Sequence, residues 1–178
     1  MNDITYHPIT PKDCRPRLFK KFSRYQEVTR VWRMVDGQWI LREENFVQQW
    51  DRRTLRREAK KLRQQIEDGC YAFGAWRGKR LIGRASLSPR LFGSQNQYAQ
   101  LKDLHITAEC RGQGVGRYLF AQCRDTAQVI GARKLYISSF PAEETLRFYA
   151  AMGCVDAEEP DPELRRKEPL DRHLELAL

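Results

Sequence analysis

The segment Glu109–Arg117 constrains the fold of this chain more than any other, because it reads ECRGQGVGR and carries glycines at positions 112, 114 and 116. It lies between a run that predicts a strand, YAQLKDLHIT, and a pattern that predicts a helix, VGRYLFAQCRDTAQVIG. A helix N-terminus presents free backbone N–H groups and a partial positive charge, and glycines let a ligand approach the backbone closely. The segment therefore predicts a strand–loop–helix unit that binds a phosphate group.

Two well-known phosphate-binding motifs do not fit this segment. A P-loop ends in Gly-Lys followed by Ser or Thr, whereas this chain has Gly116, Arg117 and Tyr118. A dinucleotide-binding fingerprint has the spacing GxGxxG near the first strand, followed about 20 residues later by Asp or Glu. Here the spacing is GxGxG, about 100 residues into the chain, and the following strand, KLYIS, contains no acidic residue. Both motifs are therefore disfavoured.

Strand and helix patterns fill the rest of the chain, without internal repeats. In chain order, the sequence predicts a strand in ITYHPIT, a helix in DCRPRLFKKFSRY, two strands joined by a hairpin turn at Asp36-Gly37, a helix in WDRRTLRREAKKLRQQIEDGC, strands in YAFGAWR and RLIGRASL, a loop in SPRLFGSQNQ, a strand in KLYIS, a helix in AEETLRFYAAMG and a final strand in EPLDRHLELAL. This order favours one α/β or α+β domain. The strands YAQLKDLHIT and KLYIS are expected to pair in parallel through a right-handed crossover.

The composition suits a soluble globular protein, since 31% of the 178 residues are charged and 41% are hydrophobic. No run of 18 apolar residues predicts a membrane span, and the N-terminus does not resemble a secretory signal. The five cysteines are scattered and include no CxxC pair. We interpret them as reduced thiols of a cytoplasmic protein, and no metal site is expected.

The net charge of +9 favours an anionic partner, such as nucleic acid, anionic lipid or a phosphorylated small molecule. A basic surface that binds no such partner is an equally open alternative. Seven Lys and Arg residues between Arg52 and Arg63 lie on one predicted helix, and a nucleic-acid-binding role is one interpretation of them. Asp51, Glu58 and Glu67 interrupt this charge, and no base-reading motif is present. A solvated helix face is therefore the preferred interpretation, and nucleic acid is not the expected partner.

The hexapeptide Arg111-Gly112-Gln113-Gly114-Val115-Gly116 matches the pattern Arg/Gln-x-x-Gly-x-Gly/Ala. It resembles the coenzyme A pyrophosphate loop of the GNAT superfamily of N-acetyltransferases. The later segment TLRFYAAMGC is similar to the second landmark of that family, and the strand KLYISS separates the two. The resemblance covers about residues 71–155. It implies a mixed, mostly antiparallel central sheet with one splayed parallel strand pair and helices on both faces.

The resemblance also implies an activity and a division of the chain. It implies an N-acetyltransferase that moves an acetyl group from acetyl-CoA to a primary amine by direct attack, without a metal. Residues 1–178 would form a single domain, with acceptor-side elements over about 1–70 and the acetyl-CoA-binding core over about 71–178. The acceptor side includes a hairpin with Trp32 and Trp39. A non-catalytic acyl-CoA sensor is the alternative, and the choice between a monomer and a homodimer stays open.

Cofactor-binding residues follow from the same resemblance. The pyrophosphate would lie on the loop and helix start, at Arg111, Gly112, Gln113, Gly114, Val115, Gly116 and Arg117. The pantetheine arm would lie along the strand edge at Leu104, His105 and Ile106, facing residues 134–138, and an amide near Leu104 or Ile106 would polarise the thioester carbonyl. Ala142 stands where many family members have an asparagine that contacts the phosphopantetheine. That contact is expected instead from Ser138, Ser139 or Thr145.

Candidate catalytic residues lie close to these positions. Tyr149 matches the usual donor of a proton to the leaving thiolate. An amine near pKa 10 is mostly protonated at pH 7, so a base is needed. Its candidates are Asp103 and His105, which share one strand face, and Glu143 or Glu144 at a helix start. Direct transfer is favoured over a covalent route through Cys110, and Cys154, in place of an aromatic residue, should affect packing more than chemistry.

Overall fold

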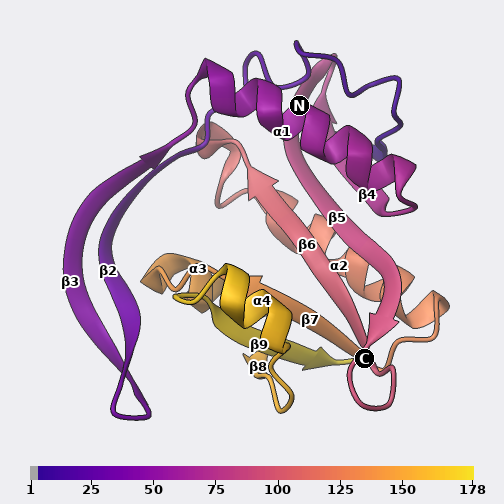
Figure 1. The fold of residues 1–178 in the computed structure, drawn as a ribbon. Coiled ribbons are helices and arrows are strands. Elements are labelled where there is room, and N and C mark those ends of the chain that lie inside the picture. The colour runs from indigo at the N-terminus through magenta and orange to yellow at the C-terminus, as the bar shows by residue number, and fades with distance from the viewer. Residues whose placement is uncertain (1–3) are drawn as a thin grey trace.

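The chain forms strands and helices in the mixed order that its sequence predicts (Figure 1). A computed structural model describes residues 4–178. The elements, in chain order, are β1 Ile4–Pro8, β2 Tyr25–Val35, β3 Gln38–Gln49, α1 Arg52–Glu67, β4 Tyr71–Arg77, β5 Arg80–Phe92, β6 Tyr98–Ile106, the 3-10 helix η1 Ala108–Cys110, α2 Val115–Val129, β7 Lys134–Ser139, α3 Glu143–Ala151, β8 Val155–Asp156, α4 Pro162–Lys167 and β9 Arg172–Ala177.

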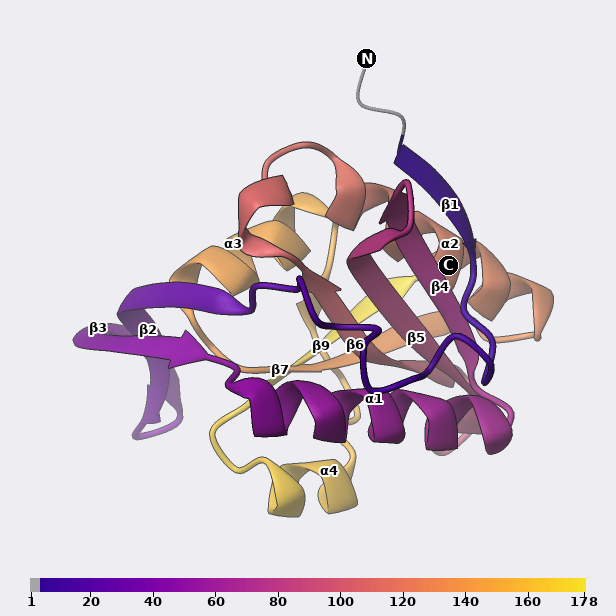
Figure 2. The ribbon, with the colours of Figure 1, turned by 90° about the horizontal axis from the view of Figure 1, so that it is seen from above.

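Seven strands form one sheet in the order β1-β4-β5-β6-β7-β9-β8, while β2 and β3 form a separate two-stranded sheet. Within the described chain, β6 and β7 are the one parallel pair among these strands, and the other pairs are antiparallel. Helix α1 covers one face of the main sheet and α2 the opposite face (Figure 2). These features confirm the predicted sheet, its parallel pair and the helices on both faces.

Apolar stripes on the two long helices hold them against the sheet. Helix α2 buries the side chains of Val115, Leu119, Phe120, Cys123 and Ala127. On the other face, Ala59 and Leu62 of α1 pack into a cluster with Phe19 and Phe22. Fully burying a leucine-sized side chain contributes about 1.5–3 kcal/mol, so this packing fixes β5 and β6 between the two helices.

The predicted hairpin is present and extends away from the main sheet (Figure 1). Asp36 and Gly37 have φ angles of 48° and 79°, as the two central residues of a type I′ turn require. The hairpin meets the rest of the chain near the start of α3, where the Trp32 N–H donates to the Pro141 carbonyl at 2.8 Å. This contact sets the hairpin beside the end of β7.

The prediction of a helix in DCRPRLFKKFSRY is wrong. The segment makes successive turns, in which the Leu18 N–H donates to the Arg15 carbonyl and the Phe22 N–H to the Phe19 carbonyl, both at 2.9 Å. Phe19 and Phe22 are buried under α1, with their rings edge to face. The burial of both rings in that cluster outweighs the local preference for an amphipathic helix.

Two further local differences concern the second half of the chain. Strand β5 continues through Phe92, so the first half of the predicted loop SPRLFGSQNQ is strand and the turn begins at Gly93. The short helix α4 is additional. Its N-terminal signal is present in the sequence, because the Asp161 side chain accepts a hydrogen bond from the Leu164 N–H and Pro162 occupies the first turn.

Two further properties of the described chain concern membrane-spanning helices and cysteines. No helix among residues 4–178 is both long enough and apolar enough to cross a membrane. All five cysteines are buried and carry free thiols.

Candidate functional site

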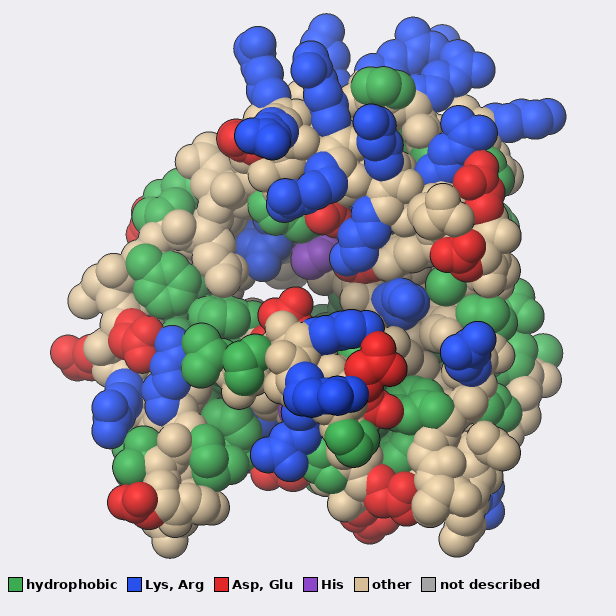
Figure 3. Space-filling model, in the orientation of Figure 1, with side chains coloured by type: hydrophobic (Ala, Val, Ile, Leu, Met, Phe, Trp, Pro, Cys, Tyr) green, Lys and Arg blue, Asp and Glu red, His purple; other side chains and the backbone are tan. Residues whose placement is uncertain are grey.

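A cleft of about 1110 Å³ lies where β6 and β7 separate. In Figure 3 it is the hollow between the cationic surface of α1 and the side chains of α3 and α4, with a histidine on its wall. Of the residues predicted for the site, those that line the cleft are Asp103, Leu104, His105, Ile106, Arg111, Gly112, Gly114, Gly116, Arg117, Ser138, Thr145 and Tyr149. The fold therefore brings nearly the whole predicted set to one place.

The separation of β6 and β7 begins after a short paired stretch. Residues 98–101 of β6 pair with residues 134–137 of β7, and the pairing stops there. Lys102 is a bulge residue, because Leu101 pairs with Leu87 of β5 and Asp103 with Ser86. The expectation that Leu104–Ile106 face residues 134–138 is therefore wrong in register. Alternate backbone groups of this stretch point into the gap instead of bonding a strand.

The glycine loop ends in a helix start whose backbone is open. Gly112 and Gly114 have φ angles of 73° and 80°, which side-chain-bearing residues rarely adopt. No side chain caps α2, and an added Cβ at either glycine would meet no atom within 4 Å. Gly116 differs, because its Cβ would lie 3.3 Å from the Phe148 ring. The free N–H groups and positive end of α2 therefore lie beside the cleft.

The other predicted loop residues divide into two groups. Arg111 and Arg117 line the cleft and bring positive charge to the helix start. The side chains of Gln113 and Val115 do not line the cleft. Gln113 donates to the Glu109 carbonyl at 3.0 Å and accepts from Arg77 at 3.2 Å, and Val115 is buried in the core. Any role of these two in binding is confined to their backbone.

Asp103 is held in a buried polar network on the α1 side of β6. Its carboxylate lies 3.0 Å from Lys61 Nζ and accepts hydrogen bonds from Gln65 at 2.8 Å and Ser86 at 3.0 Å. Burial alone would raise its pKa, but Arg84, 3.5 Å away, together with nearby His105 and the charge of Lys61, holds that pKa well below its usual range. Asp103 is therefore a carboxylate that resists protonation.

His105 lies next to Asp103 and under an aromatic ring. Its Nε2 is 3.7 Å from Asp103 Oδ1, and its ring centroid is 4.8 Å from that of Trp50. Burial lowers the pKa of His105 to about 4, and the charge of Arg84 acts in the same direction. The imidazole is neutral at pH 7 as a result.

Tyr149 projects from α3 into the cleft and is 7% exposed. Burial raises the pKa of its phenol, and nearby thiols and the carboxylates of Asp103 and Asp171 add to the effect. The hydroxyl therefore keeps its proton throughout the physiological range. Glu144, one of the candidate bases, also lines the cleft, whereas Glu143 points elsewhere.

A comparison with the sequence profiles of protein families identifies the family of this chain. The sequence profile of the family described as Acetyltransferase (GNAT) family matches residues 34–154, more than half of the 178-residue chain. The chain belongs to this family.

Solved structures share the fold of this GNAT family member at low sequence identity. Nourseothricin acetyltransferase has a TM-score of 0.70 and 17% identity, with 98% of each chain covered. A protein provisionally assigned as a streptothricin acetyltransferase from Bacillus anthracis str. Ames, in complex with acetyl coenzyme A, has a TM-score of 0.71 and 14% identity over 99% of each chain. The PaiA N-acetyltransferase from Thermoplasma acidophilum, in complex with coenzyme A, has a TM-score of 0.62 and 14% identity, also over 99% of each chain. A comparison with curated protein sequences finds no match.

The GNAT family member also places polar side chains in the cleft that sequence reasoning missed. They include Arg24, Glu168 and Asp171. Asp171 accepts a hydrogen bond from Ser138 Oγ at 2.9 Å, and burial, with a contribution from Glu168, raises its pKa to about 6. No spacing in the sequence signals these residues, because each reaches the cleft from a loop whose path depends on the fold.

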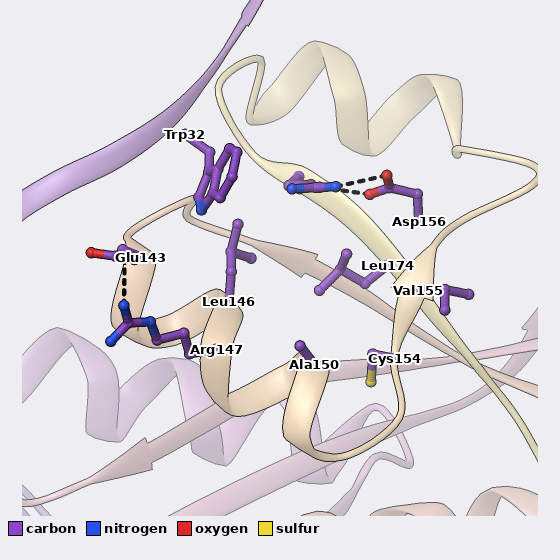
Figure 4. A pocket seen from close by; sticks show the side chains of 10 residues that line it. Trp32, Glu143, Leu146, Arg147, Ala150, Cys154, Val155, Asp156 and Leu174 are labelled. Carbon is purple, nitrogen blue, oxygen red and sulfur yellow. Dashed lines mark hydrogen bonds and ion pairs between the residues drawn. The ribbon is translucent and has the colours of Figure 1, made fainter. Parts of the chain in front are cut away.

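A second, smaller cavity of about 220 Å³ lies on the other side of α3 (Figure 4). Trp32, Leu146 and Leu174 line its apolar part. Its charged groups are already paired: Glu143 with Arg30 and Arg147, each at 2.8 Å, and Asp156 with Arg172 at 2.6 Å. Glu143 is thus engaged in ion pairs away from the main cleft.

The basic residues of α1 gather on its solvent-facing side (Figure 3). Lys61 pairs with Asp103 and Arg63 with Glu67, and no other ion pair of the described chain involves this helix's exposed cations. Among residues 4–178, no group of three or more His, Cys, Asp or Glu side chains is placed to hold a metal ion.

Proposed function

We propose that this GNAT family member transfers the acetyl group of acetyl-CoA to a primary amine by direct attack in a ternary complex. One observation carries the proposal. A single cleft joins the open helix start of α2, the gap between β6 and β7, and the buried phenol of Tyr149. Structures of similar fold in complex with acetyl coenzyme A and coenzyme A support it.

The loop before α2 fits a diphosphate. Because a Cβ at Gly112 or Gly114 would meet nothing within 4 Å, there is room for an anion against the backbone. The N–H groups around residues 113–116 would donate to its oxygens, and the positive end of the helix favours negative charge there. Arg111 and Arg117 would add charge from the cleft wall.

The strand gap fits an extended, amide-containing arm. The free backbone groups of β6 between Asp103 and Ile106 would pair with that arm much as a neighbouring strand would. An N–H near Leu104 or Ile106 would donate to the thioester oxygen as negative charge develops on it. Loss of one such donor typically costs about 3–4 kcal/mol of transition-state stabilisation. Ser138 and Thr145, which also line the cleft, would hold the arm from the other side.

Tyr149 would protonate the leaving thiolate. An unperturbed phenol of pKa near 10 is about 1.5 units weaker as an acid than a thiol near 8.5, a difference of roughly 2 kcal/mol. Burial of Tyr149 widens this difference, so the transfer would depend on a well-placed hydrogen bond to the thiolate. Burial holds the proton on Tyr149 until the thiolate forms. Asp103 would orient His105 beside the cleft, but an imidazole with a pKa of about 4 is a weak acceptor at neutral pH.

In this proposal one domain carries both halves of the reaction, with acceptor-side elements over about residues 1–70 and the acetyl-CoA-binding core over about 71–178. The buried, unpaired cysteines suit a reducing, cytoplasmic compartment. Nourseothricin acetyltransferase shares only 17% identity with this chain, so its name does not transfer an acceptor.

A panel of amines tests the proposal. Purified protein is given acetyl-CoA with free amino acids, lysine-containing peptides, polyamines and aminoglycosides, and thiol release is measured. Amine-dependent release is the expected result. Acetyl-CoA binding without release for any amine would favour the acyl-CoA sensor instead. Absence of binding, together with salt-sensitive binding to duplex DNA, would overturn the assignment in favour of a nucleic-acid role for α1.

A further inference from the structure

The loop between α4 and β9 brings two carboxylates into the cleft, those of Glu168 and Asp171. Asp171 stands at the point where the parallel strands part. Its Oδ2 accepts a 2.9 Å hydrogen bond from Ser138 Oγ, and Ser138 is the first residue of β7 beyond the paired stretch. The carboxylate is thus fixed at the closed end of the gap, beside the place where the thioester would lie.

Neither carboxylate has a cationic partner within residues 4–178. Asp103, another carboxylate of the cleft, is different because it is paired with Lys61 and lies 3.5 Å from Arg84. Asp171 is only partly exposed, with one hydroxyl as its hydrogen-bond donor. A partly buried carboxylate without a counter-charge is costly, and a bound cation would remove that cost.

A second, independent feature faces the same space. Tyr149 is 7% exposed, lines the cleft, and its pKa is raised by burial and by charges, without a hydrogen bond from the described residues. Asp171 is close enough for its charge to act on that phenol. The cleft therefore holds, among the described residues, a proton donor on α3 without a hydrogen-bond partner and a carboxylate on the loop before β9 without a cationic partner.

The charges around Asp171 come from several elements. Glu168 of the same loop and Glu144 and Tyr149 of α3 line the cleft together with Asp171. From β7, Ser138 contributes the hydroxyl that donates to Asp171. The facing walls carry Arg24, Lys102 and Arg111. Three of the four carboxylates that line the cleft, those of Glu144, Glu168 and Asp171, thus come from α3 and from the loop between α4 and β9.

We propose that Glu168 and Asp171 form the binding site for the ammonium group of the acceptor, and that Asp171 takes the proton that frees the amine for attack. This inference rests on the proposed acetyl transfer and names its acceptor class, a cationic primary amine. Glu168 holds the cation, and Asp171 is the catalytic base.

The proton and electron balance is complete. A proton passes from the ammonium to the Asp171 carboxylate, and the nitrogen lone pair forms a bond to the thioester carbon. The carbon–sulfur bond breaks, and Tyr149 gives its proton to the thiolate. The acylated nitrogen then loses its second proton, which returns to the Tyr149 phenolate, and Asp171 releases its proton to water. The products are an amide, a thiol and one proton.

The environment of Asp171 suits this role. Burial, then the charge of Glu168, raises its pKa to about 6. The carboxylate is therefore ionised at pH 7 yet a stronger base than an ordinary aspartate near 3.9. General bases of this kind contribute about 100-fold or more to rate.

The test compares Asp171→Asn with Glu163→Gln, which changes an exposed carboxylate of α4 outside the cleft. For an alkylamine acceptor identified by the panel, Asp171→Asn should lower kcat/KM about 100-fold at pH 7 and remove the acidic limb of its pH profile. The acetyl-CoA dissociation constant from calorimetry should not change. Glu168→Gln should raise KM for the amine and move the acidic limb to lower pH, and Glu163→Gln should match the wild type.

A base is needed only for an amine that is protonated at pH 7. The loss of kcat/KM in Asp171→Asn should therefore be smaller for an acceptor such as a hydrazide, whose nitrogen is neutral at that pH. A purely structural defect would lower kcat/KM equally for both kinds of acceptor. Amine binding to the complex with CoA, measured by calorimetry, is the second readout.

The outcomes separate the two proposals. Turnover by Asp171→Asn at the wild-type rate, with the same pH profile, overturns the role of Asp171 while leaving acetyl transfer intact. Amine binding that depends on Asp171 and Glu168, but without thiol release, supports the ammonium site and overturns acetyl transfer. Amine binding that both variants retain at full affinity overturns the ammonium site.

Discussion

Tyr149 shows how burial sets the chemistry of one residue. On a surface its phenol would exchange protons with water, but in the cleft it is 7% exposed and its pKa is raised by burial. The same environment leaves the hydroxyl without a hydrogen-bond partner among the described residues. The phenol therefore keeps its proton throughout the physiological range.

Replacing Tyr149 with Phe should lower kcat by about 100-fold, because only the proton donor is removed. The KM for acetyl-CoA should change little, since the ring still packs against Phe148. Steady-state kinetics measure both values. Tyr71→Phe, at an exposed tyrosine of β4, is the matched control and should have no effect. A Tyr149→Phe enzyme with wild-type turnover would remove this residue from the mechanism.

Gly114 is a second residue, and its proposed role in binding a phosphate rests on its backbone. Its φ of 80° and the open space above it are what a helix start requires to admit an anion. Gly131, at the other end of α2, has a φ of 88° and is equally open. The two glycines carry the same conformational strain on substitution but differ in what lies nearby.

Gly114→Glu should weaken acetyl-CoA binding at least about 100-fold, because it places a carboxylate against the diphosphate and like charges at that distance cost several kcal/mol. Gly131→Glu should lose comparable stability but keep wild-type affinity. Isothermal calorimetry with acetyl-CoA gives the dissociation constants, and thermal unfolding gives the stabilities. Equal affinity in the two variants would contradict a phosphate site at this loop.

At the scale of elements, α1 is attached to the sheet by charge as well as by apolar packing. Arg84 of β5 is fully buried and lies 2.7 Å from Glu58 of α1, while Lys61 of the same helix reaches Asp103 of β6. The Arg84 guanidinium also lies 5.4 Å from the centre of the Phe19 ring. The network couples the position of α1 to the strand that lines the cleft.

Glu58→Ala should therefore lower the free energy of unfolding by about 3 kcal/mol, because a buried guanidinium loses its closest counter-charge. Glu67→Ala removes an exposed partner of Arg63 on the same helix and should cost less than about 1 kcal/mol. Urea unfolding monitored by circular dichroism compares the two. Similar losses would indicate that the buried pair is no stronger than a surface one.

At the scale of the whole molecule, two groups of the cleft oppose each other in the pH dependence of stability. His105 has a folded pKa of about 4, below an unfolded value near 6.5, so it destabilises the fold as the pH falls through that range. Asp171 has a folded pKa of about 6, above an unfolded value near 3.9, so its penalty grows as the pH rises through that range. The carboxylate of Asp171 is thus held at a cost in stability at neutral pH.

Asp171→Asn should accordingly be more stable than the wild type at pH 7.5, by about 1–3 kcal/mol, because the neutral amide keeps the Ser138 hydrogen bond without the buried charge. The difference should vanish below about pH 3, where the wild-type carboxyl is protonated in both the folded and the unfolded state. Urea unfolding across this pH range measures it. A constant difference at every pH would contradict the raised pKa of Asp171.

Local signals in the sequence were sufficient for most elements of the fold. Asp36-Gly37 marked the hairpin, Asp68-Gly69 the end of α1, and the glycine loop the start of α2. The predicted helix in DCRPRLFKKFSRY failed because the burial of Phe19 and Phe22 under α1 outweighs local helix propensity. Tertiary packing of this kind is not encoded in the spacing of one segment.

Sequence by itself determined the glycine loop, the strand before it and the helix after it, because backbone conformation and periodicity are local properties of a chain. Only the tertiary structure decided the register of β6 against β7, the engagement of Asp103 by α1 and the arrival of Asp171 at the end of the gap. These depend on where distant segments meet, and the electric field and burial that set each pKa exist only after they have met.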